Sequence, residues 1–560
     1  MKYYKNIIVG GGAAGIFCAC GLLNMNKTAA APAAVQDVKA ATFATGKAAT
    51  IKSATGKAAT IKAATGKAAK NSAEDVPDRH IAGNHAPSNH TPNNHTPSNH
   101  APGKSLTGTL ILEKTSKLGT KLLMSGKGQC NITHGGPVRD FVVHYGDKGR
   151  SIRKLLQRHS NVKLCRFMES IGVPLTERED GKIFPSSLDS RDVLSSLMKY
   201  ITKGGVEIRK NISITGIKYD EEKNVFYLKI LASAAETFEG TFEETLEETL
   251  ACTNLIIATG GCSYPSTGSD GSMFKLLKRD LRLDIVTPKP ALTPVYAENY
   301  RFGDLSGVSF KDISMSVSSE SLNRTFCGDL LFTHKNLSGP LILNNSRYIS
   351  PGARLTFNFL APVSGPEAIA RFKRDFPGNG KSPQGYMSDD LGLPRRFAQL
   401  IAAELNIGEN KVSQLSGSQI KALAAALTAA PITVSGLAGF KEAMVTKGGI
   451  SLEELDLSNM KSLKYPGLYF IGEIVDVDGD TGGYNLQFAF SSAWAAAADI
   501  SRSAVGISNY ADTDSSSSTD ADNSISADAD ISNSAVSSET GNTDAQSVPV
   551  SFRDNVPGKG

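Results

Sequence analysis

The sequence predicts an α/β protein in which a β-rich region is inserted into a parallel sheet covered by helices. Two glycine-rich turns predict the parallel sheet, because each follows a short apolar strand and opens a helix, at residues 7–23 and 468–497. Between them, residues 288–365 alternate like short strands, and residues 366–439 contain helical stretches such as "RRFAQLIAAEL". We therefore expect a β-rich domain and a small helical subdomain within the α/β domain.

The composition indicates a protein of two or three domains. The chain has 560 residues, 40% of them hydrophobic, and a net charge of +5, which gives no general case for a nucleic-acid partner. Its seven cysteines include no CxxC pair, which favours a reducing cytoplasm. No apolar run approaches the roughly 18 residues of a membrane span, and the glycines at 10–15 argue against a signal peptide.

The first turn has the pattern of a dinucleotide-binding unit. Ile7–Val9 reads as a buried strand, Gly10-x-Gly12-x-x-Gly15 follows it, and Ala13–Leu23 reads as a helix. The three glycines allow a tight turn, close approach of the backbone to a pyrophosphate, and close packing of helix on strand. The helix N-terminus adds free N–H groups and a positive dipole. The expected contacts are Gly10, Gly12, Ala13, Ala14 and Gly15.

The second strand of this unit is displaced along the sequence. It normally ends in an acidic residue about 20 positions after the last glycine, but Glu113, at the end of "LTGTLILEK", lies 98 positions after Gly15. Without Lys27–Lys104, which are 78 residues, the separation is 20. We therefore predict an intact nucleotide-binding unit with an insertion between its first helix and second strand, and expect Glu113 to bind ribose hydroxyls and Lys114 to lie beside them.

The insertion is expected to be disordered, because it consists of ten-residue and five-residue repeats without an apolar pattern. Its histidines recur every five residues and can bind a transition metal weakly, and its lysines can contact an anionic polymer. Simple repeat expansion in a tolerant surface connection is the favoured explanation, so no metal site is predicted. The Ser- and Asp-rich tail, residues 503–560, is expected to be disordered as well.

A further segment, "KLGTKLLMSGKGQCNITH" (Lys117–His134), brings a resemblance to a known family. It resembles the Lys-Leu-x-x-Ser-Gly-x-Gly-x-Cys-Asn signature of the BaiN/YhiN-like FAD-dependent oxidoreductases, which include aminoacetone-oxidase-like members. Three later segments, at 255–278, 329–343 and 467–497, also match that family in order. The signature residues are Lys121, Leu122, Ser125, Gly126, Gly128, Cys130 and Asn131.

The resemblance implies a Rossmann-like FAD-binding domain of the GR2 type, assembled from residues 1–26, 105–287 and 440–502. The helix that begins near Asn485 would direct its N-terminal N–H groups to the flavin N1/C2 edge, where negative charge accumulates on reduction. Two segments stand out: Thr287–Val295, expected as a proline-rich linker, and Glu239–Ala251, expected as an acidic repeat in a hairpin loop. The other implied FAD contacts are Ile214, Thr259, Gly260, Gly472, Glu473, Asp480, Gly483, Tyr484, Asn485 and Leu486.

The catalytic residues are not determined by the sequence. His134, His334 and Tyr484 are candidates, because they accompany the flavin motifs and because histidine titrates near neutrality. The structural alternatives are a turn cap for His334, a solvent-facing loop for His134 and packing under the flavin for Cys130.

The predicted function is an FAD-dependent oxidoreductase acting on a small organic molecule. It either reduces a conjugated double bond with NAD(P)H or oxidises an amine with oxygen. NAD(P)H would bind only transiently, because no second strand-GxGxxG unit is present. Flavin-dependent RNA modification is an alternative, although the core shows no basic-aromatic stripe. A second alternative is a non-enzymatic scaffold with the flavin fold, whose insertion binds partners or metal. The sequence leaves the oligomeric state open.

Deletion of Lys27–Lys104 separates the enzyme from the scaffold hypothesis. An enzyme should keep its flavin spectrum and its turnover within about twofold, because a surface insertion changes loop-closure entropy only slightly. Loss of partner or metal binding with an unchanged flavin band would instead support the scaffold. The measurements are the visible spectrum, steady-state turnover and metal binding by calorimetry.

Overall fold

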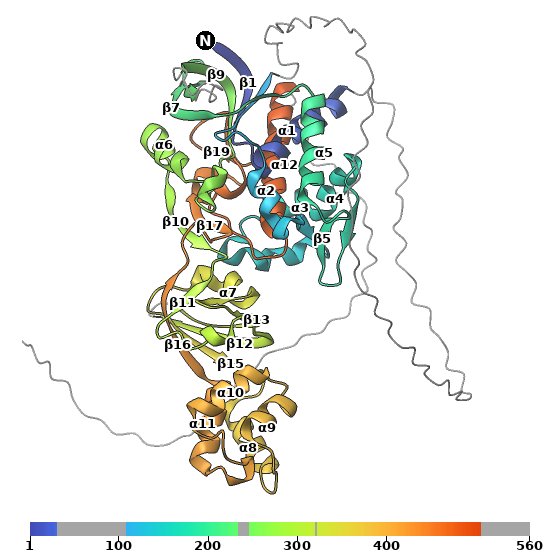
Figure 1. Ribbon diagram of the computed structural model, residues 1–560. Coiled ribbons are helices and arrows are strands. Elements are labelled where there is room, and N and C mark those ends of the chain that lie inside the picture. Colours follow the sequence, from blue (N-terminus) through green and yellow to red (C-terminus); the bar gives the residue numbers. More distant parts are fainter. Residues whose placement is uncertain (31–107, 233–245, 320–321, 506–560) are drawn as a thin grey trace, which may run out of the picture. The chain divides into compact units, whose positions relative to one another are not determined.

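The computed structural model describes residues 1–30, 108–232, 246–319 and 322–505 (Figure 1). The repeats of the insertion and nearly all of the tail lie outside the described residues, so their predicted disorder stays a prediction. None of the described helices is long and apolar enough to cross a membrane.

The central sheet confirms the interrupted nucleotide-binding unit. β1 (Lys2–Val9) pairs in parallel with β2 (Thr109–Leu112), with Ile7 opposite Leu110, although the insertion separates them in sequence. On its other side β1 pairs in parallel with β9 (Leu246–Ile257). The strand order is β18-β19-β20-β9-β1-β2-β6, and the β7–β8 hairpin joins through β8 to β9. The remaining strands are β6 (Glu207–Arg209), β7 (Ile212–Asp220), β8 (Val225–Ala232), β18 (Leu455–Asp456), β19 (Lys461–Ser462) and β20 (Leu468–Phe470).

Three helices form one layer of the nucleotide-binding domain. α1 (Ala13–Ala30) packs against both α12 (Tyr484–Val505) and α5 (Ser190–Lys203), and Figure 1 labels the three helices. The α1–α12 contact is close at Gly21, where a Cβ atom would lie 2.8 Å from that of Ala497. The Phe17 and Phe490 rings meet edge to face at 5.6 Å. These helices and the sheet share the larger of the two main apolar cores.

The other elements of this domain are short. They include a small antiparallel sheet, β3-β5-β4, and a two-stranded ribbon, β10-β17. Their bounds are β3 (Thr133–His134), β4 (Leu175–Glu177), β5 (Lys182–Pro185), β10 (Ile285–Ala291), β17 (Val445–Ile450), α2 (Thr120–Met124), α3 (Arg153–Arg158), α4 (Asn161–Ser170), α6 (Ser272–Leu281), and the 3₁₀ helices η1 (Ser125–Gly128), η2 (Val138–Lys148), η3 (Pro265–Thr267), η7 (Leu452–Glu454) and η8 (Gly472–Ile474).

The inserted region is a closed barrel with helices packed on it. Its strand order is β11-β14-β13-β12-β15-β16. Barrel and helices share the second core, in which Phe397 lies 4.9 Å from Phe310 and 4.6 Å from Phe359 between ring centroids. The bounds are β11 (Val295–Ala297), β12 (Ser309–Ser319), β13 (Leu322–Phe332), β14 (Leu337–Ser338), β15 (Arg354–Asn358), β16 (Ala430–Leu437), α7 (Pro340–Asn345), α8 (Gly365–Asp375), α9 (Pro383–Asp389), α10 (Arg395–Glu404), α11 (Gly417–Thr428), η4 (Gly303–Leu305), η5 (Ser346–Tyr348) and η6 (Val412–Gln414).

Two expected helix ends are wrong by a few residues. α1 continues to Ala30, beyond the expected end at Leu23 and into the insertion predicted from Lys27. The segment "NMNKTAA" contains no glycine or proline, and Met, Lys and Ala favour a helix, so nothing in it ends α1. The next proline in the sequence is Pro32. α12 likewise runs to Val505, past the predicted start of the tail at Ser503.

Three segments form strands that the sequence did not predict. Residues 430–437, expected in the helical subdomain, form β16, because Ile432 and Val434 alternate with exposed residues and close the barrel. Thr287–Val295, expected as a linker, lies largely in β10, whose register shifts between Val286 and Lys289, a break that accommodates Pro288. Leu246–Ala251, expected in a loop, begins β9 and pairs with β8.

The buried side chain of His159 makes the stability of the fold depend on pH. His159 lies between α3 and α4, is 6% exposed, and its carbonyl accepts hydrogen bonds from Gln487 and Ser491 of α12. Burial, together with Lys163 and Arg158, lowers the pKa of His159 to about 3. Because an unfolded histidine has a pKa of about 6.5, the unfolded chain binds more protons between these values, and stability falls as the pH drops through this window.

Replacement of His159 by Phe should remove this acid sensitivity. Between pH 7 and pH 5 the free energy of unfolding of the wild type should fall by about 2 kcal/mol more than that of His159→Phe, which cannot be protonated. Urea unfolding at both pH values measures the difference. Equal losses in the two proteins would contradict the neutral, buried state of this ring.

Candidate functional site

A cavity of 1410 Å³ lies along the edge of the central sheet where the parallel strands end. Ordinary ligand pockets occupy roughly 300–1,000 Å³, so this one has room for a dinucleotide and a second molecule. Its lining also includes Ser338, Gly339, Pro340 and Leu343 from the barrel region. The predicted cofactor residues in the lining are Gly10, Gly12, Ala13, Ala14, Glu113, Lys114, Lys121, Ser125, Gly126, Asn131, Ile214, Thr259, Gly260, Glu473, Asp480, Gly483, Asn485 and Leu486.

The three glycines of the β1–α1 turn have distinct roles. Gly10 has a φ of 108°, and a Cβ atom there would lie 2.4 Å from the Ala258 carbonyl oxygen. A Cβ atom on Gly15 would lie 1.9 Å from the Gly10 oxygen, so this position holds the helix against the turn. Gly12 has no atom within 4 Å of its added Cβ and lines the cavity. The first-turn N–H groups of α1, which lack intrahelical acceptors, therefore have open space for a pyrophosphate.

Glu113 ties the end of β2 to the glycine turn. It is 7% exposed, and its Oε2 accepts from the Gly11 N–H at 2.7 Å. Its Oε1 accepts from the Thr115 N–H at 2.7 Å and the Thr115 hydroxyl at 2.8 Å. A carboxylate has about four acceptor positions, so at least one remains for a ribose hydroxyl.

A charged cluster joins two predicted motifs that lie far apart in the sequence. The Lys121 ammonium contacts both Ser263 Oγ and Glu473 Oε2, and Ser263 Oγ donates to Glu473 Oε1. Glu473 Oε1 also accepts from the Thr446 N–H at 2.9 Å. Sequence reasoning identified Lys121 and Glu473 but not Ser263 and Thr446; Ser263 lies within the matched segment 255–278, whereas Thr446 belongs to no recognised pattern.

Two buried hydroxyls in the cavity lining show that it suits a polar ligand. Thr259 Oγ1 and Ser269 Oγ have no hydrogen-bond partner among the described residues. An unsatisfied buried polar group costs about 1–3 kcal/mol, and a bound nucleotide would satisfy both. The residues present therefore fit FAD.

The loop before α12 is braced by two asparagines. In the amide orientation that satisfies both of its polar atoms, Asn131 accepts from the Gly483 N–H at 3.2 Å. Asn485 donates to the Gly479 carbonyl and accepts from the Gly479 N–H, both at 2.8 Å. Gly483 has a φ of 93°, and a Cβ atom there would lie 2.6 Å from Thr133 Cα. Both asparagines thus shape the loop as well as line the cavity.

Some predicted cofactor residues support the cavity without lining it. A Cβ atom on Gly472 would lie 2.6 Å from that of Ala14, so this glycine lets η8 approach α1. Cys130 is fully buried, and burial raises the pKa of its thiol to about 11, opposed by a hydrogen bond with Ser125. The predicted residues outside the lining of the larger cavity are Gly15, Gly128, Cys130, Gly472 and Tyr484.

A second cavity of 420 Å³ shares wall residues with the first, including Pro340 and Asp480. Its lining comes from the nucleotide-binding domain and from the barrel region. It brings together His134 and Tyr484, two predicted candidates, with His144, which sequence reasoning missed. His334 lines neither cavity and is exposed in the turn after β13.

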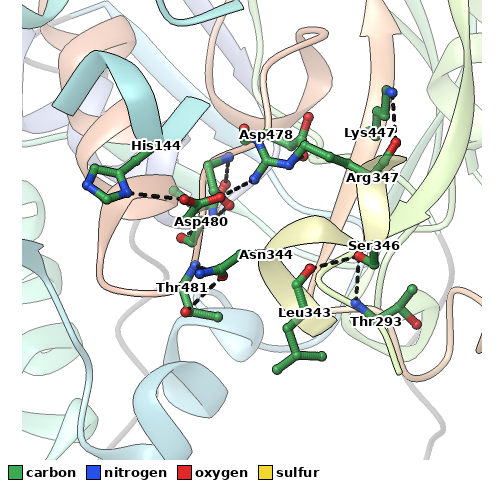
Figure 2. Close-up of polar contacts among 12 residues, drawn as sticks. His144, Thr293, Leu343, Asn344, Ser346, Arg347, Lys447, Asp478, Asp480 and Thr481 are labelled. Carbon is green, nitrogen blue, oxygen red and sulfur yellow. Dashed lines mark hydrogen bonds and ion pairs between the residues drawn. The ribbon is translucent and has the colours of Figure 1, made fainter. Parts of the chain in front are cut away.

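Figure 2 shows the ion network that holds the loop between the two cavities. The Arg347 side chain is 4% exposed; its Nη2 lies 2.6 Å from Asp480 Oδ1 and its Nε lies 3.2 Å from Asp478 Oδ2. Burial raises the pKa of Asp478, and the neighbouring Arg347 guanidinium opposes that shift. Thr481 donates from its N–H and its hydroxyl to Asn344 Oδ1, at 2.9 and 3.0 Å. The inserted region thus fixes residues 478–481 through α7 and η5.

A family model described as "HI0933-like protein Rossmann domain" matches residues 100–499. The match begins just before β2 and so omits β1 and α1. The structure joins these two elements to the matched part through the β1–β2 and β1–β9 pairs.

Three relatives match most of the chain. The ribosomal RNA dihydrouridine synthase of Haemophilus influenzae is 29% identical over 406 residues, which are 71% of this chain and 93% of that protein. The Escherichia coli protein of the same name is 28% identical, over 71% of this chain and 93% of its own length. The 3-dehydro-bile acid delta(4,6)-reductase of Clostridium scindens is 24% identical, over 69% of this chain and 91% of its own length.

Alanine at Gly12 and at Gly15 should separate cofactor binding from folding. Gly12→Ala has free space, so the free energy of unfolding without FAD should change by less than about 0.5 kcal/mol. FAD affinity should fall at least about tenfold, because the methyl group occupies the pyrophosphate space. Gly15→Ala should destabilise the cofactor-free protein by about 2 kcal/mol or more through overlap with the Gly10 carbonyl.

Urea unfolding and fluorescence titration with FAD measure the two effects. Equal loss of stability in both variants would contradict the different roles of these glycines.

Proposed function

The chain belongs to the HI0933-like Rossmann domain family, and from this premise we propose that it reduces a carbon–carbon double bond conjugated with a carbonyl group, with uridine in RNA as the substrate. It is an FAD-dependent oxidoreductase, as the sequence predicts. The observation that carries the proposal is the composite lining of the larger cavity, which combines the cofactor motifs with residues of the inserted barrel.

FAD, when bound, supplies the exchange of two electrons with an organic substrate. The residues of this chain would hold it in sequence along the cavity. The α1 N-terminus would take the pyrophosphate, Glu113 the ribose, and Lys121 with Glu473 the sugar-alcohol chain. The N–H groups at the start of α12 would lie at the flavin edge that becomes negative on reduction.

The names of the relatives support one reaction type. Formation of dihydrouridine saturates the uracil C5–C6 bond, which is conjugated with the C4 carbonyl. A delta(4,6) reduction of a 3-dehydro bile acid also saturates a bond conjugated with a ketone. Both reactions add a hydride to one carbon and a proton to its neighbour. The predicted alternative of amine oxidation has no support in the names of the three relatives.

A basic segment of the chain favours RNA over a small molecule. Residues 138–170 carry eight Lys or Arg and three Asp or Glu, an excess that sequence analysis did not single out. The segment includes His144, which lines that cavity. Contacts between basic side chains and phosphates provide much of the affinity of proteins for RNA. A base can also leave its stack to enter a pocket. The exposed basic side chains include Arg139, Arg150, Arg153, Lys154, Lys163 and Arg166.

A small-molecule enone is the second candidate, because the Clostridium scindens relative carries a bile-acid reductase name. The apolar side chains Leu331, Leu343 and Met444 in the larger cavity would suit such a substrate. NAD(P)H is the proposed electron donor in both cases, and the size of the cavity allows it to bind transiently beside FAD.

The purified protein with NADPH should form dihydrouridine in ribosomal RNA transcribed without modifications, measured by mass spectrometry of nucleosides. The double variant Arg153→Glu, Lys154→Glu should bind RNA more weakly and lower the salt dependence of binding by about two counterions, because two phosphate contacts are lost. Bleaching of the flavin by NADPH should not change.

The matched control is Lys373→Glu, Lys421→Glu, at exposed positions on α8 and α11. Turnover of a steroid enone without any reaction on RNA would reject RNA as the substrate and support the second candidate.

A further inference from the structure

Three aromatic rings stack in the wall of the second cavity. The His144 and Tyr484 ring centroids are 4.1 Å apart with an interplanar angle of 14°, and those of Tyr484 and His134 are 5.5 Å apart at 13°. His144 belongs to η2, His134 to β3, and Tyr484 begins α12. The fold therefore places two imidazoles and one phenol at a single cavity.

Hydrogen bonding distinguishes the two imidazoles. His134 Nδ1 lies 3.1 Å from the Gly135 carbonyl oxygen and its Nε2 lies 3.0 Å from that of Asp180, so backbone acceptors face both nitrogens. His144 Nδ1 lies 3.1 Å from Asp480 Oδ2. Within the part of the chain that the structure describes, His144 Nε2 makes no hydrogen bond. Only His144 thus keeps a ring nitrogen for a molecule in the cavity.

Asp480 is held in turn from two sides. Its Oδ1 binds the buried Arg347 guanidinium, and its N–H donates to the His144 carbonyl oxygen at 2.8 Å (Figure 2). A carboxylate fixed in this way directs His144 Nδ1–H toward itself, which sets the orientation of the ring and leaves Nε2 as the second donor of the protonated form.

We propose that His144 is the proton donor of the reduction, with Asp480 and Arg347 as positioning residues. This assignment rests on the proposed function. The reaction breaks the π bond and forms two C–H bonds: the β carbon receives a hydride from the bound flavin, whose electrons come from NAD(P)H, and the α carbon receives the Nε2 proton of His144. Solvent then returns a proton to the ring.

The other ionisable groups of this cavity are weaker candidates or helpers. Burial raises the pKa of Tyr484, so its phenol stays protonated and resists proton transfer. Cys327 of β13 offers an exposed thiol as the competing donor. The ionisable groups that share the cavity with His144 are His134, Asp180, Lys182, Cys327, Asp480 and Tyr484.

Stopped-flow measurement of the FAD-loaded, full-length protein tests the proposal in two half-reactions. His144→Gln should bleach with NADPH at a rate within about threefold of wild type, but its reoxidation by RNA should slow at least about 100-fold. Wild-type reoxidation should slow as the pH rises, because the acid must be protonated, and this dependence should disappear in His144→Gln. His334→Gln, a histidine exposed outside both cavities, should match wild type.

A second readout does not need turnover. In ¹⁵N-histidine spectra of the full-length protein, the signals lost in His144→Gln identify the ring. In the wild type these signals should show that the neutral His144 ring carries its proton on Nδ1. In Asp480→Ala they should show a mixture of the Nδ1–H and Nε2–H tautomers.

Three outcomes would each overturn the proposal. These are reoxidation of His144→Gln at the wild-type rate, slow reoxidation in Cys327→Ser alone, and a His144 ring that does not carry its proton on Nδ1 in the neutral form. Failure of the proposed function is distinct, because it would appear in the wild type as an absence of reoxidation by RNA or enone.

Discussion

The parallel pairing of β1 with β2 and β9 determines where the parts of the nucleotide site lie. It brings the ends of three strands to one edge, so that the glycine turn, Glu113 and Thr259 line the same cavity. The hydrogen bond from Gly11 to Glu113 then locks the turn to β2. Because these pairs are formed by backbone groups of a buried apolar sheet, a long insertion between α1 and β2 leaves them unchanged.

The inserted region depends on this frame and completes it. Arg347 of η5 reaches into the loop before α12 and binds Asp478 and Asp480 where water is almost excluded. Removal of one partner from such a buried pair costs about 3–5 kcal/mol, since the remaining charge loses its compensation. The barrel thus contributes part of a cavity wall and also controls the geometry of a loop in the other domain.

Local patterns predicted many of the residues that line the larger cavity but few of those that meet at the second one. The spacing from Gly15 to Glu113 predicted a strand pair across the insertion, and the structure contains it. By contrast, no motif surrounds His144 or Arg347, and His334, which lies within a recognised motif, is exposed outside both cavities. Proline at 288 and 290 suggested a linker, yet a register shift allows β10 to pair with β17.

The sequence by itself determined the interrupted Rossmann-like unit, the glycine-rich turns and the acidic residues at strand ends. These features depend on backbone conformations within a few residues, for which glycine and the strand–helix periodicity are direct signals. Only the tertiary structure decided which polar groups meet at the second cavity, because residues 144, 347 and 480 belong to three segments that packing alone brings together. Such contacts have no fixed spacing along the chain, so sequence periodicity does not reveal them.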